Sequence, residues 1–277
     1  MKAVNFEKYK FRCHALGRIM AGESLGLTPN QEKEYAALDA RYKGEGLPLT
    51  EKQIQKHSEL HAKKHKKPGL TDGVKTYLQE LFKEAVFDRR KEIYSDTLYK
   101  GVAVEEMSIT LYSTRVGKPF FKNKERRSND YVTGEPDNVQ GKIRDIKSSW
   151  DIHTFPIYDR KLPSRIYWWQ VQGYMWLWGL DSAEVVYCLV DTPEELIQDA
   201  IRRYAWKMNY IDVPAEEEKK IRHSMTFGDI PEELRVRVFT IDFNPKAIDV
   251  LKKKIELCRK YMERLNKELI DRLQLID

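Results

Sequence analysis

The stretch Lys142–Lys147 constrains the fold of this chain most, because its side chains alternate as those of a β-strand do. Successive side chains of a strand point to opposite faces, so Asp145 and Lys147 share one face and Ile146 packs on the other. A glycine turn at Gln140-Gly141 precedes the stretch. We therefore expect a strand on which a carboxylate and an ammonium group face the same site.

The rest of the chain alternates helical and strand patterns. The pattern from Phe120 to about Lys147 is that of β-structure, and further strands are expected over 184–190 and 235–243. Apolar residues at helical spacing predict helices over residues 5–22, 71–86, 95–113, 164–179, 193–208 and 245–273. This order predicts an α/β fold, with a small mixed β-sheet flanked by helices and a long C-terminal helix.

Residues 28–68 are a highly charged insert near the N-terminus. Two helical patterns, for which Thr28 and Thr50 are suitable N-caps, flank a glycine-rich turn at 44–46. We expect an inserted, charged helical hairpin within a single domain that spans residues 1–277. That length suffices for one large domain or two small ones.

The composition limits the classes of protein to which the chain can belong. Charged residues make up 33% of it and no apolar run of about 18 residues occurs, so we expect no membrane span. The first residues lack the apolar stretch of a signal peptide, which favours the cytoplasm. The 3 cysteines fit free thiols and are too few for an iron–sulfur cluster held by four thiolates. The net charge of +6 permits a polyanionic partner.

A second carboxylate motif, Gly134-Glu135-Pro136-Asp137, ends eight residues before Asp145. If this segment pairs with the strand as a β-hairpin, Asp137 lies beside Asp145, and Pro136 stiffens the approach. Carboxylate oxygens are the ligands that Mg²⁺ prefers. A bound Mg²⁺ lowers the pKa of an attacking water and offsets the charge that phosphodiester hydrolysis places on phosphate oxygens. Asp137, Asp145 and the Ile146 carbonyl are therefore predicted metal ligands, and Lys147 is predicted to orient the water or neutralise the phosphate.

A further carboxylate ligand is expected from the preceding helix. On a helical wheel with about 100° per residue, Glu105 falls within an apolar stripe and Glu106 falls off its edge. The stripe consists of Leu98, Val102, Ile109 and Tyr112. A carboxylate in a core-facing stripe is costly unless something pairs with it, and a metal ion would do so.

Four motifs in this order resemble those of the PD-(D/E)XK nuclease superfamily: Gly101-x-x-x-Glu105, Gly134-x-Pro136-Asp137, Asp145-x-Lys147 and Gln170-x-x-x-Tyr174. The last motif is similar to that of the branch with RecB-like nucleases and YqaJ-like viral recombinases, which includes lambda-type exonucleases. The resemblance is close over residues 95–190. It implies a restriction-endonuclease-like core and a Mg²⁺-dependent deoxyribonuclease in which Mn²⁺ substitutes for Mg²⁺.

In this family the helix with the glutamine and tyrosine borders the active site. Gln170 and Tyr174 are four residues apart and share a helix face. The resemblance implies that the glutamine helps position the metal-bound water or the DNA strand. Gln172 is an alternative to Gln170, because lambda-type exonucleases share a Q-V-Q run. The predicted catalytic residues are Glu105, Asp137, Asp145, Lys147, Gln170 and Tyr174, and the predicted metal ligands are Glu105, Asp137, Asp145 and Ile146.

Basic residues near the predicted site suit contacts to a DNA backbone. Residues 118–127 carry five positive charges and one negative charge, and Arg89-Arg90-Lys91 form a second basic group; a solvated loop is the alternative for both. Arg12 occupies the place where related exonucleases contact a terminal phosphate, although the serine that follows it there is absent here. The predicted DNA contacts are Arg12, Arg89, Arg90, Lys122, Lys124, Arg126, Arg127, Ser148 and Trp150.

For Ser148 and Trp150 the sequence leaves two interpretations open. A hydroxyl at Ser148 can bind a phosphate or cap the next segment, and Trp150 can stack on a DNA end or be buried. We retain both residues as candidates for contact with DNA.

The first functional hypothesis is a DNA exonuclease of the viral recombination type, which degrades one strand from a duplex end with two Mg²⁺ ions. The resemblance also implies a bacteriophage origin, a homo-oligomer such as a ring-shaped trimer, and a single-strand annealing protein as partner. One alternative is a structure-specific or restriction-like endonuclease with the same chemistry. Another is a catalytically inactive DNA-binding module, which the complete carboxylate and lysine set disfavours.

Overall fold

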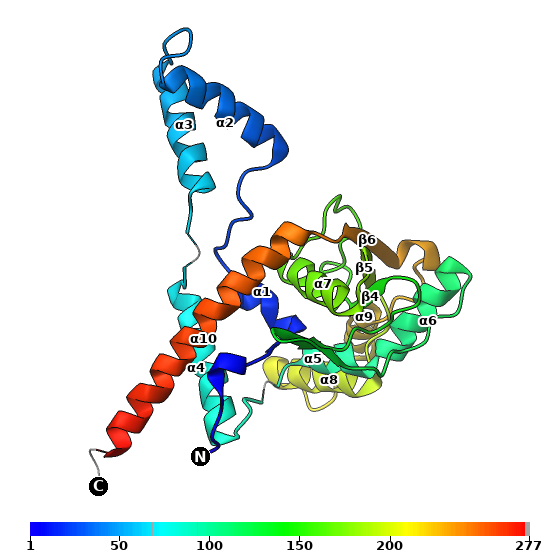
Figure 1. The fold of residues 1–277 in the computed structure, drawn as a ribbon. Helices are drawn as coiled ribbons and strands as arrows, with labels where there is room; N and C mark the ends of the chain where they lie inside the picture. The colour runs from blue at the N-terminus through cyan, green and yellow to red at the C-terminus, as the bar shows by residue number, and fades with distance from the viewer. Residues whose placement is uncertain (68, 93, 275–277) are drawn as a thin grey trace. The chain divides into compact units, whose positions relative to one another are not determined.

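The computed structural model describes residues 1–67, 69–92 and 94–274. The chain divides into two compact units, one formed by Met1–Arg18 and Lys83–Asn244 and the other by Ile19–Phe82 and Pro245–Asp277 (Figure 1). The expected α/β fold is confirmed, with mixed sheets, flanking helices and a long C-terminal helix. The expectation of a single domain over the whole length stays a prediction.

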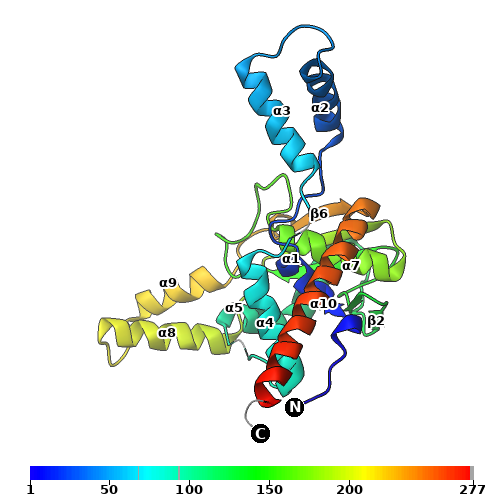
Figure 2. The same cartoon turned by 60° about the vertical axis from the view of Figure 1, so that its left-hand side comes forward.

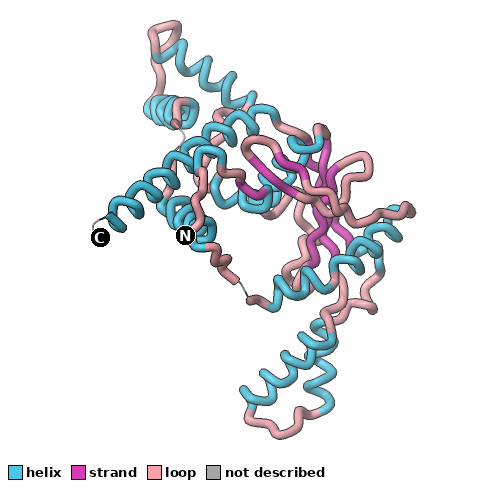
Figure 3. The backbone as a smooth tube through the Cα atoms, turned by 60° about the horizontal axis from the view of Figure 1, so that its bottom comes forward, coloured by secondary structure: helices cyan, strands magenta, loops and turns pink. Residues whose placement is uncertain are grey.

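The main sheet lies in the first unit and has the order β4-β5-β6. Figure 3 draws the strands in magenta. β4 (Ile143–Ser148) runs parallel to β5 (Ser182–Cys188), and β6 (Val236–Asp242) runs antiparallel to β5. The central strand β5 is buried along nearly its whole length. A strand covered by helices on both faces is expected to have a nearly continuous apolar sequence, and Ala183–Cys188 largely has one.

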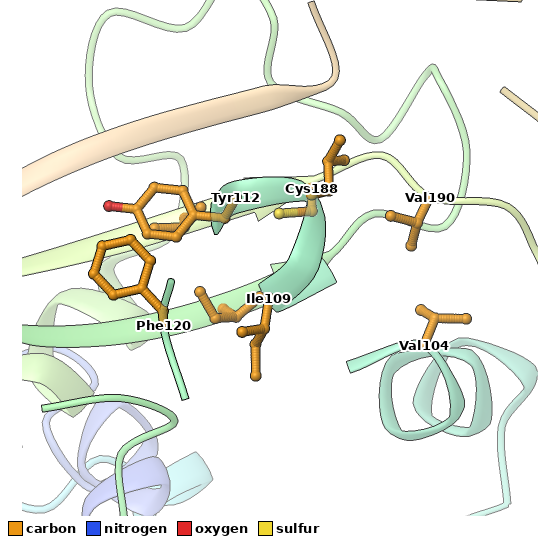
Figure 4. Packing of buried hydrophobic residues seen from close by; sticks show 9 residues of the cluster. Val104, Ile109, Tyr112, Phe120, Cys188 and Val190 are labelled. Carbon is orange, nitrogen blue, oxygen red and sulfur yellow. The ribbon is translucent and has the colours of Figure 1, made fainter. Parts of the chain in front are cut away.

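Helices α6 (Glu105–Val116) and α7 (Arg165–Trp178) cover opposite faces of this sheet (Figure 1). On the α6 side, Ile146 joins an apolar cluster, of which Figure 4 shows Val104, Ile109, Tyr112, Phe120, Cys188 and Val190. Each helix ends at a glycine with a positive φ, Gly117 at +69° and Gly179 at +65°. Burial of this cluster fixes which face of β4 is turned toward α7.

A continuous helix over 95–113 was expected, and this expectation is wrong. The structure has α5 (Asp96–Ala103) and α6, with a break at Val104, whose φ of −106° and ψ of 13° are not helical. Val104 is buried in the apolar cluster, whereas Leu98 and Val102 are exposed. Burial of Val104 turns the chain, so the apolar stripe of the helical wheel does not exist as one surface.

The expected helix over 5–22 is also wrong. That segment contains the short elements η1 (Phe6–Lys8), β1 (Phe11–Arg12), η2 (Cys13–Ala15) and α1 (Leu16–Ile19). β1 pairs in parallel with β3 (Val132–Gly134), which pairs with β2 (Arg127–Ser128) to complete a second small sheet. The Phe11 N–H donates to the Tyr131 carbonyl at 3.0 Å, so this stretch bonds to a distant segment and not to its own next turn.

Helix α8 (Glu194–Met208) and helix α9 (Ala215–Met225) lie side by side in the first unit (Figure 2). A short helix η3 (Glu232–Leu234) follows them. α9 was not predicted, although Pro214 followed by acidic residues 216–218 is a start signal for a helix. Its weak apolar periodicity, with no buried residue, explains the omission.

The second unit contains the charged insert, most of α4 (Asp72–Phe87), and α10 (Pro245–Gln274). The insert forms α2 (Pro29–Tyr42) and α3 (Glu51–Lys64), and capping boxes at Thr28 and Thr50 confirm both expected N-caps. Tyr35, Leu38 and Leu60 form a small apolar core between the two helices. Residue 68, the predicted end of the insert, lies outside the described residues.

None of the helices in the described residues is long and apolar enough to cross a bilayer. Cys13, Cys188 and Cys258 are buried free thiols. Burial raises the pKa of Cys188 to about 12 and that of Cys258 to about 12, so both stay protonated at neutral pH.

A buried charge pair joins β4 to β5 on the α6 side of the sheet. Arg144 and Glu184 are register partners, and Arg144 Nε donates to Glu184 Oε2 at 3.0 Å. The Tyr112 hydroxyl donates to the same oxygen at 2.6 Å, and Lys142 Nζ donates to Glu184 Oε1 at 2.8 Å. Burial raises the pKa of Glu184, but these donors and the Arg144 charge outweigh it, and the net pKa is lowered.

The substitution Glu184→Gln is expected to lower the free energy of unfolding by about 3 kcal/mol at neutral pH, because Arg144 would lose its buried counter-charge. Since the pKa of Glu184 is lowered by folding, its contribution is present above the unfolded pKa of 4.5 and is lost as the pH falls. Urea unfolding of both proteins should therefore show a smaller difference at about pH 3.5 than at about pH 7. A difference independent of pH would contradict this account.

Candidate active site

Asp145 and Lys147 extend from β4 on the face turned toward α7. The Asp145 side chain is almost fully buried, and its Oδ2 lies 2.9 Å from Lys147 Nζ. The ammonium group also lies 4.7 Å from the centre of the Tyr167 ring. Burial lowers the pKa of Lys147, but the charges of Asp145 and Asp137 outweigh it and the net pKa is raised. Lys147 therefore stays charged at neutral pH.

Helix α7 supplies the amide that holds the other oxygen of Asp145. Gln170 Nε2 donates to Asp145 Oδ1 at 2.9 Å and to the Tyr174 hydroxyl at 3.2 Å. Gln172 instead donates to the Asp242 carbonyl at 2.8 Å and accepts from the Asn244 N–H at 2.8 Å, next to the end of β6. Of the two glutamines considered from the sequence, the structure thus brings Gln170 to the carboxylate.

The glycine of the Gly-Glu-Pro-Asp motif makes room for Tyr174. A Cβ atom at Gly134 would lie 2.6 Å from Tyr174 Cε1 and 2.7 Å from Cys13 Sγ, closer than side chains pack. Burial, and then the charge of Asp145, raise the pKa of Tyr174. Its hydroxyl therefore stays protonated, and a glycine is required beside it for the ring to reach Gln170.

Asp137 approaches β4 from a loop. The expected hairpin strand is not formed: the segment makes one isolated antiparallel bridge, between Asn138 and Arg144. Asp137 Oδ2 accepts a hydrogen bond from the Ile146 N–H at 2.6 Å, and this contact brings the carboxylate beside the strand. Burial and then the charge of Asp145 raise the pKa of Asp137 to about 7, and Glu105 adds to this while Lys147 opposes it.

Glu105 is the first residue of α6, directly after the break at Val104. Its Oε2 lies 2.6 Å from Lys122 Nζ, and the side chain is 21% exposed, so it is not part of a buried apolar stripe. Glu105 therefore does not lie on the core-facing stripe that the helical wheel predicted, because the helix is interrupted at Val104. Glu105 still lies close enough to Asp137 to raise the pKa of that carboxyl.

Glu105, Asp137 and Asp145 together suit a hard divalent cation, which prefers oxygen ligands. No group of three or more His, Cys, Asp or Glu residues in the described part of the chain is preformed as a metal site. Instead, lysines lie against two of the carboxylates, Lys147 at Asp145 and Lys122 at Glu105. Asp145 Oδ2 is buried and lies at ion-pair distance from Lys147 Nζ, so a bound cation would share this oxygen with the lysine.

Two of the predicted DNA contacts, Arg12 and Arg90, lie near His14, which was not predicted. Burial lowers the pKa of His14, and so do the positive charges of Arg12, Arg90, Arg18 and Lys147, in that order. The N-terminal arginine, the basic group after α4 and the lysine of β4 thus lie within electrostatic range of one side chain. The signal available in the sequence was the run Arg12-Cys13-His14, which places the imidazole next to the arginine.

The other predicted DNA contacts differ in how free their charges are. Arg126 is paired with Glu135 at 3.0 Å, and Arg127 is paired with Glu125 at 2.7 Å and packs on the Trp178 ring. Arg89 and Lys124 are exposed. Paired side chains contribute less net charge to a DNA-binding surface than unpaired ones. Arg126 and Arg127 are therefore weaker candidates for contact with DNA than Arg89 and Lys124.

Ser148 and Trp150 follow the lysine of β4 and both have partners inside the protein. The Ser148 hydroxyl lies 2.8 Å from that of Ser108, and the Trp150 carbonyl accepts from Lys100 Nζ at 2.8 Å. Burial lowers the pKa of Lys100 to about 8, with Asp151 and Asp191 opposing that effect. Lys100 was not identified from the sequence, where it belonged to the expected long helix.

Divalent cation binding is expected to release about one proton from the protein near pH 6 and almost none above about pH 8. The reason is that Asp137, with its pKa raised to about 7, holds a proton below that pH and must lose it to bind a cation. Calorimetric titration with Mn²⁺ in two buffers of different ionisation enthalpy measures this number. Asp137→Asn should abolish the release of a proton, and the control Glu135→Gln should not. Equal heats in both buffers at pH 6 would show that no proton is released and would exclude Asp137 as its source.

No protein-family model matches the chain, and no curated protein matches it. Solved structures are similar to it. A phage-related exonuclease from Haemophilus somnus 129PT is 25% identical, covers 96% of this chain and 98% of its own, and superposes with a TM-score of 0.65. An alkaline exonuclease (LHK-Exo) from Laribacter hongkongensis is 13% identical, covers 76% and 90%, and has a TM-score of 0.51. The resemblance inferred from the motifs is thereby confirmed: this chain has the fold of the PD-(D/E)XK nucleases of the viral recombinase type.

Proposed function

We propose that this protein is a metal-dependent DNA exonuclease of the viral recombination type, which hydrolyses phosphodiester bonds from duplex ends. The observation that carries the proposal is the convergence of Asp137, Asp145 and Lys147 at β4, with Glu105 nearby, in a nuclease fold. Similarity to a phage-related exonuclease over nearly the whole length of both chains supports an exonuclease rather than an endonuclease.

We further propose that Glu105, Asp137, Asp145 and the Ile146 carbonyl hold two Mg²⁺ ions, for which Mn²⁺ substitutes. When bound, such ions offset the charge on the reacting phosphate and lower the pKa of the attacking water. Gln170 fixes one oxygen of Asp145, so the carboxylate is oriented before any ligand arrives. Lys147, which stays charged, would neutralise a phosphate oxygen next to Asp145.

The positive charges near His14 favour binding of an anionic ligand beside the carboxylates. Arg12, Arg90 and Lys147 contribute to one region of positive potential, which suits a DNA phosphate. We propose Arg12 and Arg90 as the main DNA contacts, with the exposed Arg89 and Lys124 as further contacts. The weaker candidates have partners within the protein and are Lys122, Arg126, Arg127, Ser148 and Trp150.

The resemblance extends the proposal to partners. We propose a homo-oligomer such as a trimer, and association with a single-strand annealing protein, for a protein that acts in the cytoplasm of a phage-infected host. Equilibrium sedimentation of the purified chain measures the first of these.

The test of the function is a digestion time course on matched linear and covalently closed circular duplex DNA, with Mg²⁺ or with EDTA. Progressive loss of the linear form alone, only with Mg²⁺, is expected. Lys147→Met should lower the rate at least about a hundredfold, because a charge at the reacting phosphate is removed. Lys142→Met is the matched control, since its ammonium group is bonded to Glu184 and not to Asp145, and should keep the rate.

Other outcomes of this assay would exclude the proposal. Cleavage of the circle would identify an endonuclease. Lack of cleavage of either substrate with either Mg²⁺ or Mn²⁺ would leave a DNA-binding module without nuclease activity. An active Lys147→Met protein would exclude the proposed role of the lysine.

Binding of a labelled duplex in EDTA, measured by fluorescence anisotropy over a range of salt concentrations, tests the proposed contacts. The logarithm of the affinity should fall steeply with the logarithm of the salt concentration. Arg12→Ala and Arg90→Ala should each lower that slope by about 1. Arg127→Ala should change it less, because Glu125 already neutralises that guanidinium. Equal effects of all three substitutions would contradict the ranking.

A further inference from the structure

The loop that carries Asp137 has little regular structure of its own. It is joined to β4 by one backbone bridge, in which the Arg144 N–H donates to the Asn138 carbonyl at 2.8 Å and the Asn138 N–H donates to the Arg144 carbonyl at 3.2 Å. The Asp137 carbonyl also accepts from the Asn123 N–H at 2.7 Å, and side chains make further contacts with the loop. Two of these side-chain contacts come from Arg144, directly before Asp145.

Arg144 reaches the loop from the face of β4 opposite to Asp145. Its side chain is buried, and one terminal nitrogen donates both to Asn138 Oδ1 at 3.0 Å and to the Gln140 carbonyl at 2.8 Å. Its Nε donates to Glu184 at 3.0 Å, and its guanidinium lies over the Phe120 ring at 4.2 Å. The guanidinium therefore connects the loop to β5 through a planar group that packing holds in one orientation.

Asn138 links Arg144 both to Gln140 in the loop and to the separate segment that contains Phe121. Its Nδ2 donates to the Phe121 carbonyl at 2.8 Å, and its Oδ1 accepts from the Gln140 N–H at 3.1 Å. Asn138 is nearly fully buried. With the Asn138 side chain fixed by Arg144, the adjacent Asp137 is directed at the Ile146 N–H.

We propose that Arg144 is a positioning residue that sets the separation of Asp137 from Asp145, and this proposal rests on the proposed nuclease function. Arg144 touches neither carboxylate and acts through Asn138 and Gln140. A lysine cannot replace it, because a single ammonium group lacks the planar fork that spans Glu184 and the loop. Arg144 thus holds the loop that carries Asp137, and the adjacent Asp145 lies on β4 itself, so one strand positions both carboxylates.

The test compares Arg144→Lys with Lys142→Met, because both residues bond to Glu184 but only Arg144 bonds to the loop. Hydrogen exchange of the Ile146 amide, measured by NMR without metal, reports the contact with Asp137 directly. Exchange should be at least about tenfold faster in Arg144→Lys and nearly unchanged in Lys142→Met. The Mg²⁺ concentration for half-maximal cleavage should rise about tenfold in Arg144→Lys alone.

Unchanged Ile146 exchange in Arg144→Lys, or equal acceleration in both variants, would overturn the positioning role. If Arg144→Lys does not fold, Asn138→Ala removes the same contact from the loop side and should accelerate exchange equally. The exchange measurement needs no metal and no DNA. If the wild-type protein shows no Mg²⁺-dependent cleavage, the proposed function is refuted. The exchange measurement still decides whether Arg144 positions the loop.

Discussion

A carboxylate buried on β4 is the constraint on which the rest of the site depends. Asp145 is almost fully enclosed, and a buried charge is tolerated only when it is paired or hydrogen-bonded. Lys147 supplies a counter-charge on one side and Gln170 supplies a donor on the other. These two contacts fix where α7 must lie. Burial and then the charge of Asp145 raise the pKa of the second carboxylate, Asp137, to about 7, which keeps the total negative charge of the two groups low.

The sequence was sufficient to identify the residues that lie on regular elements. Alternation along β4 correctly placed Asp145 and Lys147 on one face, and helical spacing correctly placed Gln170 and Tyr174 on one side of α7. Periodicity works there because both elements are long and one face of each is buried. The class of fold followed from the order of such elements.

The errors concern positions where distant contacts outweigh local pattern. The break at Val104 arises because that side chain is buried against the sheet, and the loop before β4 stays irregular because Arg144 and Asn138 satisfy its polar groups in place of a paired strand. Arg144 itself could have been noticed. Alternation puts it on the same face as Ile146, and an arginine on an apolar face requires a buried partner such as Glu184.

Among the described residues β4 is an edge strand of its sheet, since the order of strands places β5 alone beside it. Edge strands expose unpaired N–H groups to which the strand of another molecule can add, and proteins commonly block them with charge or irregular chain. Here the Ile146 N–H is occupied by Asp137. The carboxylate proposed for catalysis therefore also denies this edge to a second chain. Loss of its charge would remove a barrier to self-association, so the solubility of the protein depends on a side chain of the site proposed for catalysis.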